Sequence, residues 1–141
     1  MEKFEWEIAW RDTLSVGVPE IDKEHQQFIA RVNDVNRAIV EAQDKVTVER
    51  LMDLMLMEAT RHFRHEQQLL DKWKYPKAKD HAKKHEQLIS QFNRTIKEFR
   101  EDEISFVWAL KGLRIKQLLV EHLLQEDMKY RDFLLTRQGP H

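Results

Sequence analysis

The chain of 141 residues contains no cysteine and only three glycines and three prolines. Without cysteine it can form no disulfide, thiolate nucleophile, zinc–thiolate site or cysteine-ligated iron–sulfur cluster. Any metal must therefore be held by nitrogen and oxygen atoms. Most glycines and prolines lie at expected joints, but Gly112 falls inside a helical pattern, where it costs about 1 kcal/mol relative to alanine. Gly112 thus predicts a kink or a close contact between helices.

Neither sign of charge dominates, because 24 lysine and arginine residues stand against 25 aspartate and glutamate residues, for a formal net charge of -1. A nucleic-acid partner usually needs a basic patch, so we expect none. No apolar run approaches the roughly 18 residues that span a bilayer, and the acidic start of the chain differs from a signal peptide. We expect a cytoplasmic monomer that is made in its mature form and does not insert into a membrane.

Apolar residues recur at helical spacing in four segments, which predicts helices over about residues 19–41, 48–73, 77–100 and 105–134. Pro19 suits the first turn of the first helix, Thr47 is the predicted N-cap of the second, and Pro76 separates the second from the third. Four long helices with short connections predict an all-α fold, an up-down-up-down four-helix bundle over residues 19–137, followed by a tail at 138–141.

The segment before the first helix has a different pattern. Phe4, Trp6, Ile8 and Trp10 alternate with charged or small residues, which predicts an extended stretch with one buried side. Because no second strand is apparent, we expect residues 1–18 to form an N-terminal arm that packs on the bundle.

Seven polar residues that can bind metal lie on the apolar stripes of the predicted helices. They are His25, His62, Glu66, His81, His85, His122 and Asp127. An unpartnered buried polar group costs about 1–3 kcal/mol, and a buried carboxylate costs more. Several of them would consume much of the roughly 5–15 kcal/mol of net stability of a domain. Metal coordination uses the lone pairs of these groups and removes the cost, so the set predicts a metal site.

The number of ligands predicts two metal ions. If Glu66, Asp127 and a solvent oxygen bridge two six-coordinate ions, six terminal positions remain, and the five histidines fill five of them. The open position lies on the ion with two histidines, and dioxygen fits it. Nitrogen and oxygen ligands with an open position suit non-haem iron, and they are also compatible with manganese or zinc.

The spacing of these residues disfavours two other kinds of metal site. Ferritin-like carboxylate proteins use Glu-x-x-His motifs, and no histidine here has a glutamate three residues before it. The zinc-protease motif HExxH fails because Leu69 follows His65-Glu66-Gln67-Gln68. Neutral imidazoles also put less negative charge on iron than carboxylates do, which favours reversible binding over oxygen activation. His65 and His141 remain outside the set, and we expect His65 on the surface.

The interval between His122 and Asp127 is irregular for a helical pair. Five residues place two side chains about 140° apart on an ideal helix, so both cannot face one point. We therefore expect a local bulge, a kink or a helix end near Gln125 and Glu126.

Several motifs together are highly specific: Trp10, the stretch from Val16 to His25, His62-Phe63-x-x-Glu66, Tyr75-Pro76, His81-x-x-x-His85, and His122-x-x-x-x-Asp127 followed by Tyr130. Over nearly the whole chain they resemble the hemerythrin family, specifically single-domain bacteriohemerythrins. The resemblance implies a non-enzymatic protein that binds dioxygen reversibly at two iron ions with a bridging oxo or hydroxo group. Such a protein stores oxygen, transports it, or delivers it to an oxygen-consuming enzyme. The alternatives are a di-iron enzyme, either a peroxidase or a nitric-oxide-handling reductase, and an oxygen sensor module.

The resemblance also divides the seven residues: His81, His85 and His122 on one iron, His25 and His62 on the other, and Glu66 and Asp127 bridging both. Leu119 and Leu123 match positions that line the family's oxygen pocket. The family often has tryptophan where this chain has Leu118, and a second glutamate where it has Gln67. Neither departure changes a ligand.

Overall fold

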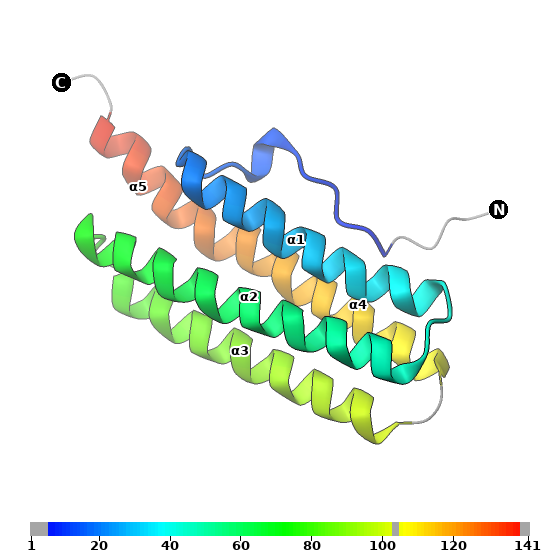
Figure 1. The fold of residues 1–141 in the computed structure, drawn as a ribbon. Coiled ribbons are helices and arrows are strands. Elements are labelled where there is room, and N and C mark those ends of the chain that lie inside the picture. The colour runs from blue at the N-terminus through cyan, green and yellow to red at the C-terminus, as the bar shows by residue number, and fades with distance from the viewer. Residues whose placement is uncertain (1–5, 103–104, 139–141) are drawn as a thin grey trace.

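A computed structural model of the chain describes residues 6–102 and 105–138, which form an all-α four-helix bundle (Figure 1). The helices are α1 (Pro19–Val40), α2 (Lys45–Lys72), α3 (Ala78–Glu101) and α4 (Ser105–His122), and α4 continues through the π-helical turn η2 (Leu123–Asp127) into α5 (Met128–Gln138). Helices α1 and α3 each pack against both α2 and α4. Short connections join successive helices, which run in opposite directions (Figure 1). The predicted fold class is therefore confirmed.

Local chemistry sets where the helices begin. Pro19 occupies the first turn of α1, as predicted. The predicted N-cap of the second helix is wrong, because Asp44 takes that position and its carboxylate accepts a hydrogen bond from the Thr47 backbone N–H at 2.8 Å. An aspartate there satisfies a free N–H group and complements the helix dipole. Helix α2 therefore begins at Lys45, before the predicted start at Val48.

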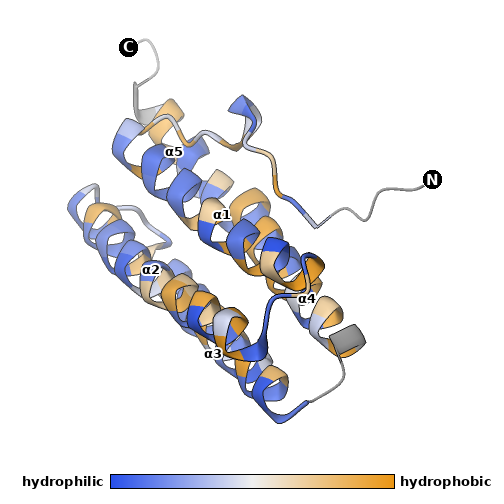
Figure 2. Ribbon diagram, turned by 45° about the vertical axis from the view of Figure 1, so that its right-hand side comes forward, coloured by the Kyte–Doolittle hydropathy of each residue, from blue (hydrophilic) through white to orange (hydrophobic). Residues whose placement is uncertain are grey.

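Buried apolar side chains form two clusters. The larger, which we call the main core, includes Phe28, Met52, Phe63, Phe92, Ile115, Leu119 and Leu123. The smaller, which we call the end cluster, comprises Val16, Ile21, Leu70, Tyr75, Ala78, Tyr130 and Leu134. Figure 2 shows hydrophobic and hydrophilic residues recurring along each helix, as expected where one face is buried and the other is solvated. None of the helices in the described ranges is both long and apolar enough to cross a membrane.

The described part of the N-terminal segment lies along α1 (Figure 1). Its contacts with the helix include a reciprocal pair of hydrogen bonds: the Ile8 backbone N–H donates to Oδ1 of Asn33 at 2.8 Å, and Nδ2 of Asn33 donates to the Ile8 carbonyl at 2.9 Å. A short 3-10 turn, η1 (Asp12–Leu14), leads from there to α1. Phe4, at the start of the arm, and His141 and the rest of the tail beyond residue 138 lie outside the described residues.

Gly112 marks a close contact between α1 and α4, one of the two features that its position predicted. A Cβ atom at this residue would lie 2.1 Å from Oδ1 of Asn36. The Asn36 side chain, only 2% exposed, donates a hydrogen bond to the Gly112 carbonyl at 3.2 Å. Glycine therefore permits a helix approach that any larger residue would obstruct, which offsets its low helix propensity.

Candidate metal centre

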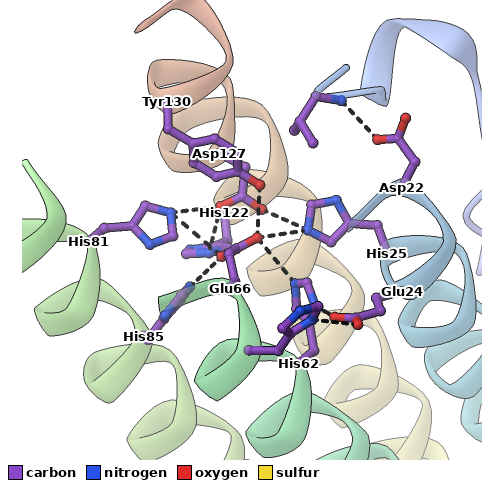
Figure 3. A network of polar contacts seen from close by, with 12 residues as sticks. Asp22, Glu24, His25, His62, Glu66, His81, His85, His122, Asp127 and Tyr130 are labelled. Carbon is purple, nitrogen blue, oxygen red and sulfur yellow. Dashed lines mark hydrogen bonds and ion pairs between the residues drawn. The ribbon is translucent and has the colours of Figure 1, made fainter. Parts of the chain in front are cut away.

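The seven residues predicted to bind metal meet in one layer of the bundle, which we call the metal layer. Figure 3 shows their side chains pointing towards one another: His25 from α1, His62 and Glu66 from α2, His81 and His85 from α3, His122 from the end of α4, and Asp127 from the end of η2. Each is at most 6% exposed. Along every helix this layer lies between residues of the main core and residues of the end cluster.

The turn η2 brings His122 and Asp127 to the same side of the fourth helix. A π-helical turn holds one more residue than an α-helical turn, and so it corrects the angular offset of an interval of five. Nε2 of His122 consequently lies 3.2 Å from Oδ1 of Asp127. The predicted irregularity near Gln125 and Glu126 is confirmed, since η2 spans Leu123–Asp127.

The two oxygens of Glu66 face different histidines. Oε2 lies 3.1 Å from Nε2 of His25 and 3.2 Å from Nε2 of His62. Oε1 lies 2.9 Å from Nε2 of His85 and 3.8 Å from Nε2 of His81. Glu66 thus stands between a pair of histidines from α1 and α2 and a pair from α3.

Asp127 divides its oxygens in the same way. Oδ2 lies 3.2 Å from Nε2 of His25, whereas Oδ1 lies 2.8 Å from Nε2 of His81 and 3.2 Å from Nε2 of His122. Both carboxylates therefore present one oxygen to the His25 side and the other to the side of α3 and α4. The donor atoms form two groups around these carboxylates: His25, His62 and Glu66 in one, and Glu66, His81, His85, His122 and Asp127 in the other.

The hydrogen bonding of the metal layer is incomplete in a way that fits metal ions. Among the described residues, eight buried side-chain nitrogen or oxygen atoms have no hydrogen-bond partner, and each of the seven predicted residues contributes one. Five of these seven atoms face the interior of the layer: Nε2 of His62, His85 and His122, Oε1 of Glu66 and Oδ2 of Asp127. The other two are Nδ1 of His25 and Nδ1 of His81, on the ring sides that face away from the carboxylates. Gln67 contributes the eighth. Such atoms are costly in a folded protein unless another partner uses their lone pairs. Imidazole and carboxylate donors together suit a non-haem iron site.

Proximity shifts the pKa values of these groups in opposite directions. Burial alone lowers the pKa of His25, but the Asp127 and Glu66 carboxylates outweigh burial and raise it to about 10. Burial likewise opposes ionisation of both acids, yet the neighbouring histidines hold the pKa of Glu66 and that of Asp127 well below their usual values. The layer therefore combines anionic carboxylates with positively charged groups, an arrangement in which cations can replace protons.

Tyr130 belongs to the site although sequence reasoning gave it no role. Its hydroxyl donates a hydrogen bond to Oε2 of Glu66 at 2.8 Å, and the side chain is fully buried. Burial, followed by the charges of Glu66 and Asp127, raises the pKa of Tyr130 well above its ordinary value. The residue is therefore a permanent neutral donor to Glu66. Its only signal in the sequence was its position three residues after Asp127.

Glu24 and His65 form a second contact that the sequence did not predict. Glu24 accepts hydrogen bonds from Nδ1 of His62 at 2.8 Å and Nδ1 of His65 at 2.6 Å (Figure 3). Burial raises the pKa of Glu24, but its hydrogen bonds with the two histidines more than compensate and lower it. His65 was expected on the surface, and its side chain is 34% exposed and belongs to neither group of metal-binding donors. Residue spacing within one helix could not reveal a contact that depends on how α1 and α2 pair.

The leucines expected to line an oxygen pocket lie in the main core. Leu119 and Leu123 are each 1% exposed, and their assignment to an oxygen pocket stays a prediction. Leu118 lines a surface pocket between α3 and α4 together with His122. A leucine at this position is consistent with an opening beside that histidine.

Comparison with known proteins agrees with the geometry. Residues 16–134 match the model of the hemerythrin HHE cation binding domain. A hemerythrin-like protein of Naegleria gruberi is 29% identical, and the match covers 89% of this chain and 92% of the relative. Bacteriohemerythrins of Clostridium acetobutylicum and Stenotrophomonas maltophilia are 28% and 25% identical, and each match covers 89% of this chain and 99% or 80% of the relative. The chain therefore belongs to the hemerythrin family, with a metal-binding domain built as a four-helix bundle.

Proposed function

We propose that the protein binds dioxygen reversibly at a non-haem di-iron centre with a bridging oxo or hydroxo group. One observation carries the proposal: Glu66 and Asp127 both divide their oxygens between the histidines of α1 and α2 and those of α3 and the fourth helix. Two bridging carboxylates imply two ions, with His25 and His62 on one and the remaining three histidines on the other. When bound, a pair of ferrous ions supplies the electrons that hold dioxygen. The ion with two histidines has room for it.

The chain's own residues favour a small apolar ligand at this centre. The ring of Phe63 stacks on His85, with centroids 4.1 Å apart, and lies 5.7 Å from the ring of His62. Phe28 approaches His62 at 6.3 Å. An aromatic wall beside the histidines excludes water and repels anions, but it leaves dioxygen unhindered. Leu119 and Leu123 would extend this apolar lining.

The ligand chemistry supports binding rather than catalysis. Five neutral imidazoles and two carboxylates place less negative charge on the ions than a carboxylate-rich set would, and so favour the ferrous state. We propose a non-enzymatic role in the cytoplasm: oxygen storage, transport, or delivery to an oxygen-consuming enzyme. The names of the related bacteriohemerythrins are consistent with this proposal.

The proposal is tested by oxygen addition to the reduced, iron-loaded protein. The protein is reduced anaerobically and exposed to oxygen, and charge-transfer absorption in the near-ultraviolet and visible range is followed before and after vacuum. The expected result is a new absorption that disappears under vacuum and returns with oxygen. His62→Ala should lose both this absorption and bound iron, whereas Asp34→Asn, a change at a partly exposed position on α1, should retain both. Direct conversion to a ferric form, or turnover with peroxide, would instead indicate an enzyme.

A further inference from the structure

One of the five histidines in the metal layer has a carboxylate at its outer nitrogen, by which we mean the ring nitrogen that faces away from Glu66 and Asp127. Nδ1 of His62 lies 2.8 Å from Oε1 of Glu24, while Nε2 of His62 faces Glu66. The outer nitrogens of His25 and His81 are buried and have no hydrogen-bond partner in the described part of the chain. No carboxylate among the described residues lies within ion-pair distance of the outer nitrogen of His25, His81, His85 or His122. His62 alone has one there.

Glu24 is itself held in place from outside the metal layer. Its second oxygen, Oε2, accepts a hydrogen bond from Nδ1 of His65 at 2.6 Å, and Nε2 of His65 lies 3.8 Å from Oε2 of Glu20. The side chains of Glu24, His65 and Glu20 are 24%, 34% and 57% exposed, so the chain of contacts runs from the buried His62 to the surface. Figure 3 shows the Glu24 carboxylate directed at the His62 ring. Both oxygens of the Glu24 carboxylate therefore have a histidine partner, which fixes the orientation of the side chain.

A carboxylate at the outer nitrogen of a metal-binding histidine has two effects. It fixes the tautomer and the ring orientation, so that the other nitrogen presents its lone pair to the metal. It also draws the Nδ1 proton towards itself, which makes the imidazole a stronger donor. Both effects act here on His62, which belongs to the side of the centre that has two histidines rather than three.

We infer that Glu24 is a positioning residue that orients His62 and strengthens its bond to the ion with fewer histidines. The inference rests on the two-ion centre of the proposed function, but it does not require oxygen binding. A stronger donor on the two-histidine side offsets part of the charge that a third histidine would have supplied. It would also keep His62 in position on the side of the centre where fewer histidines would hold the ion.

The test compares Glu24→Ala and Glu24→Gln with Asp34→Asn in anaerobic Fe²⁺ titrations against a chromophoric chelator. The substitution Asp34→Asn is a matched control, because it removes one negative charge from α1 at a partly exposed position, where the partners of Asp34 are Arg31 and Arg37. Glu24→Ala is expected to weaken the binding of one ion by about 10–100-fold and leave the other unchanged. Asp34→Asn should bind both ions as the unmodified protein does.

Glu24→Gln separates orientation from charge. The amide oxygen can still accept the Nδ1 proton of His62, so its iron affinity should lie closer to that of the unmodified protein. Its reduction potential should nevertheless rise, because a neutral acceptor makes His62 a weaker donor and destabilises the ferric state. A merely structural role for Glu24 would not shift the potential in this direction. Circular dichroism checks that all variants keep their helical content.

Two results would overturn the inference: Glu24→Ala binds both ions normally, or it weakens both ions equally. A different result would contradict the proposed function and leave this inference intact. A protein that binds two ions, loses one selectively in Glu24→Ala, and forms no reversible oxygen absorption would retain the positioning role and lose the oxygen-carrier role.

Discussion

The main core and the metal layer are equally buried, yet they differ in how their atoms are satisfied. Phe92, Met52 and Ile115 in the main core are 0% exposed, and so are Glu66 and Asp127 in the metal layer. The main core consists of apolar atoms that lose nothing by leaving water and gain about 25 cal/mol for each Å² that they bury. The metal layer holds nearly all of the unpartnered buried polar atoms found among the described residues.

This difference indicates that the bundle is stabilised in two ways, by burial of apolar surface and by binding of a ligand. The main core stabilises the fold under any condition in which apolar surface avoids water. The metal layer stabilises it only when something occupies the lone pairs of its histidines and carboxylates. A substitution in the main core should therefore cost the same free energy of unfolding with and without metal, whereas the contribution of the metal layer should depend on the metal state.

Removal of both metal ions should produce the largest change. A ligand that binds only the folded state stabilises it by about 4 kcal/mol when its free concentration is 1,000 times its Kd, and the proposed centre would bind two ions. Denaturant unfolding of the protein, monitored by circular dichroism with Fe²⁺ under anaerobic conditions and again with a chelator, measures the loss. The free energy of unfolding should increase with the logarithm of the free metal concentration.

The metal-free protein should remain folded in this experiment, because protons take the place of the ions. The carboxylates raise the pKa of His25 to about 10, so a proton on that imidazole compensates one of the two carboxylate charges near neutral pH, and the raised pKa values of His62 and His81 favour protons there too. A free energy of unfolding that is independent of metal concentration would contradict the view that the metal layer depends on a ligand.

Phe92→Ala should have the next largest effect, and it should be the same with and without metal. Phe92 is fully buried in the main core and packs edge-on against Phe28, with ring centroids 6.2 Å apart. Truncation of a buried phenylalanine costs about 3–5 kcal/mol through lost burial and the cavity left behind. Denaturant unfolding of this variant in both metal states tests the separation. A loss that appears in only one metal state would show that the two regions are coupled.

The contrast between the two regions also explains what could be predicted from the sequence. The main core follows from helical periodicity, which is local, and this is why the four helices and their antiparallel order were predicted. The histidines predicted to bind metal lie on the same stripes, so their burial was predictable too. The irregular turn at Leu123–Asp127 was predictable because an interval of five between His122 and Asp127 conflicts with ideal helix geometry.

The contacts that sequence reasoning missed all depend on how separate elements meet. Glu24 reaches His62 and His65 only because α1 and α2 pair in one particular register. Tyr130 reaches Glu66 from a helix that begins after the π-helical turn. The error at Thr47 was local and avoidable, since Asp44 is also a preferred N-cap residue and lies three positions earlier.

Tyr130→Phe should have the smallest of the three effects, and its size should depend on the metal state. The substitution removes one hydroxyl and with it the 2.8 Å hydrogen bond to Oε2 of Glu66, while the ring stays in the end cluster. A hydrogen bond to a charged group contributes about 1.5–3 kcal/mol, and this range should apply to the metal-free protein. In the loaded protein the ions neutralise the Glu66 carboxylate, so the same bond should contribute less. Denaturant unfolding of Tyr130→Phe in both states measures the difference. A cost that is equal in the two states would mean that bound metal does not weaken the hydrogen bond, and Tyr130 would then stabilise the fold independently of the ions.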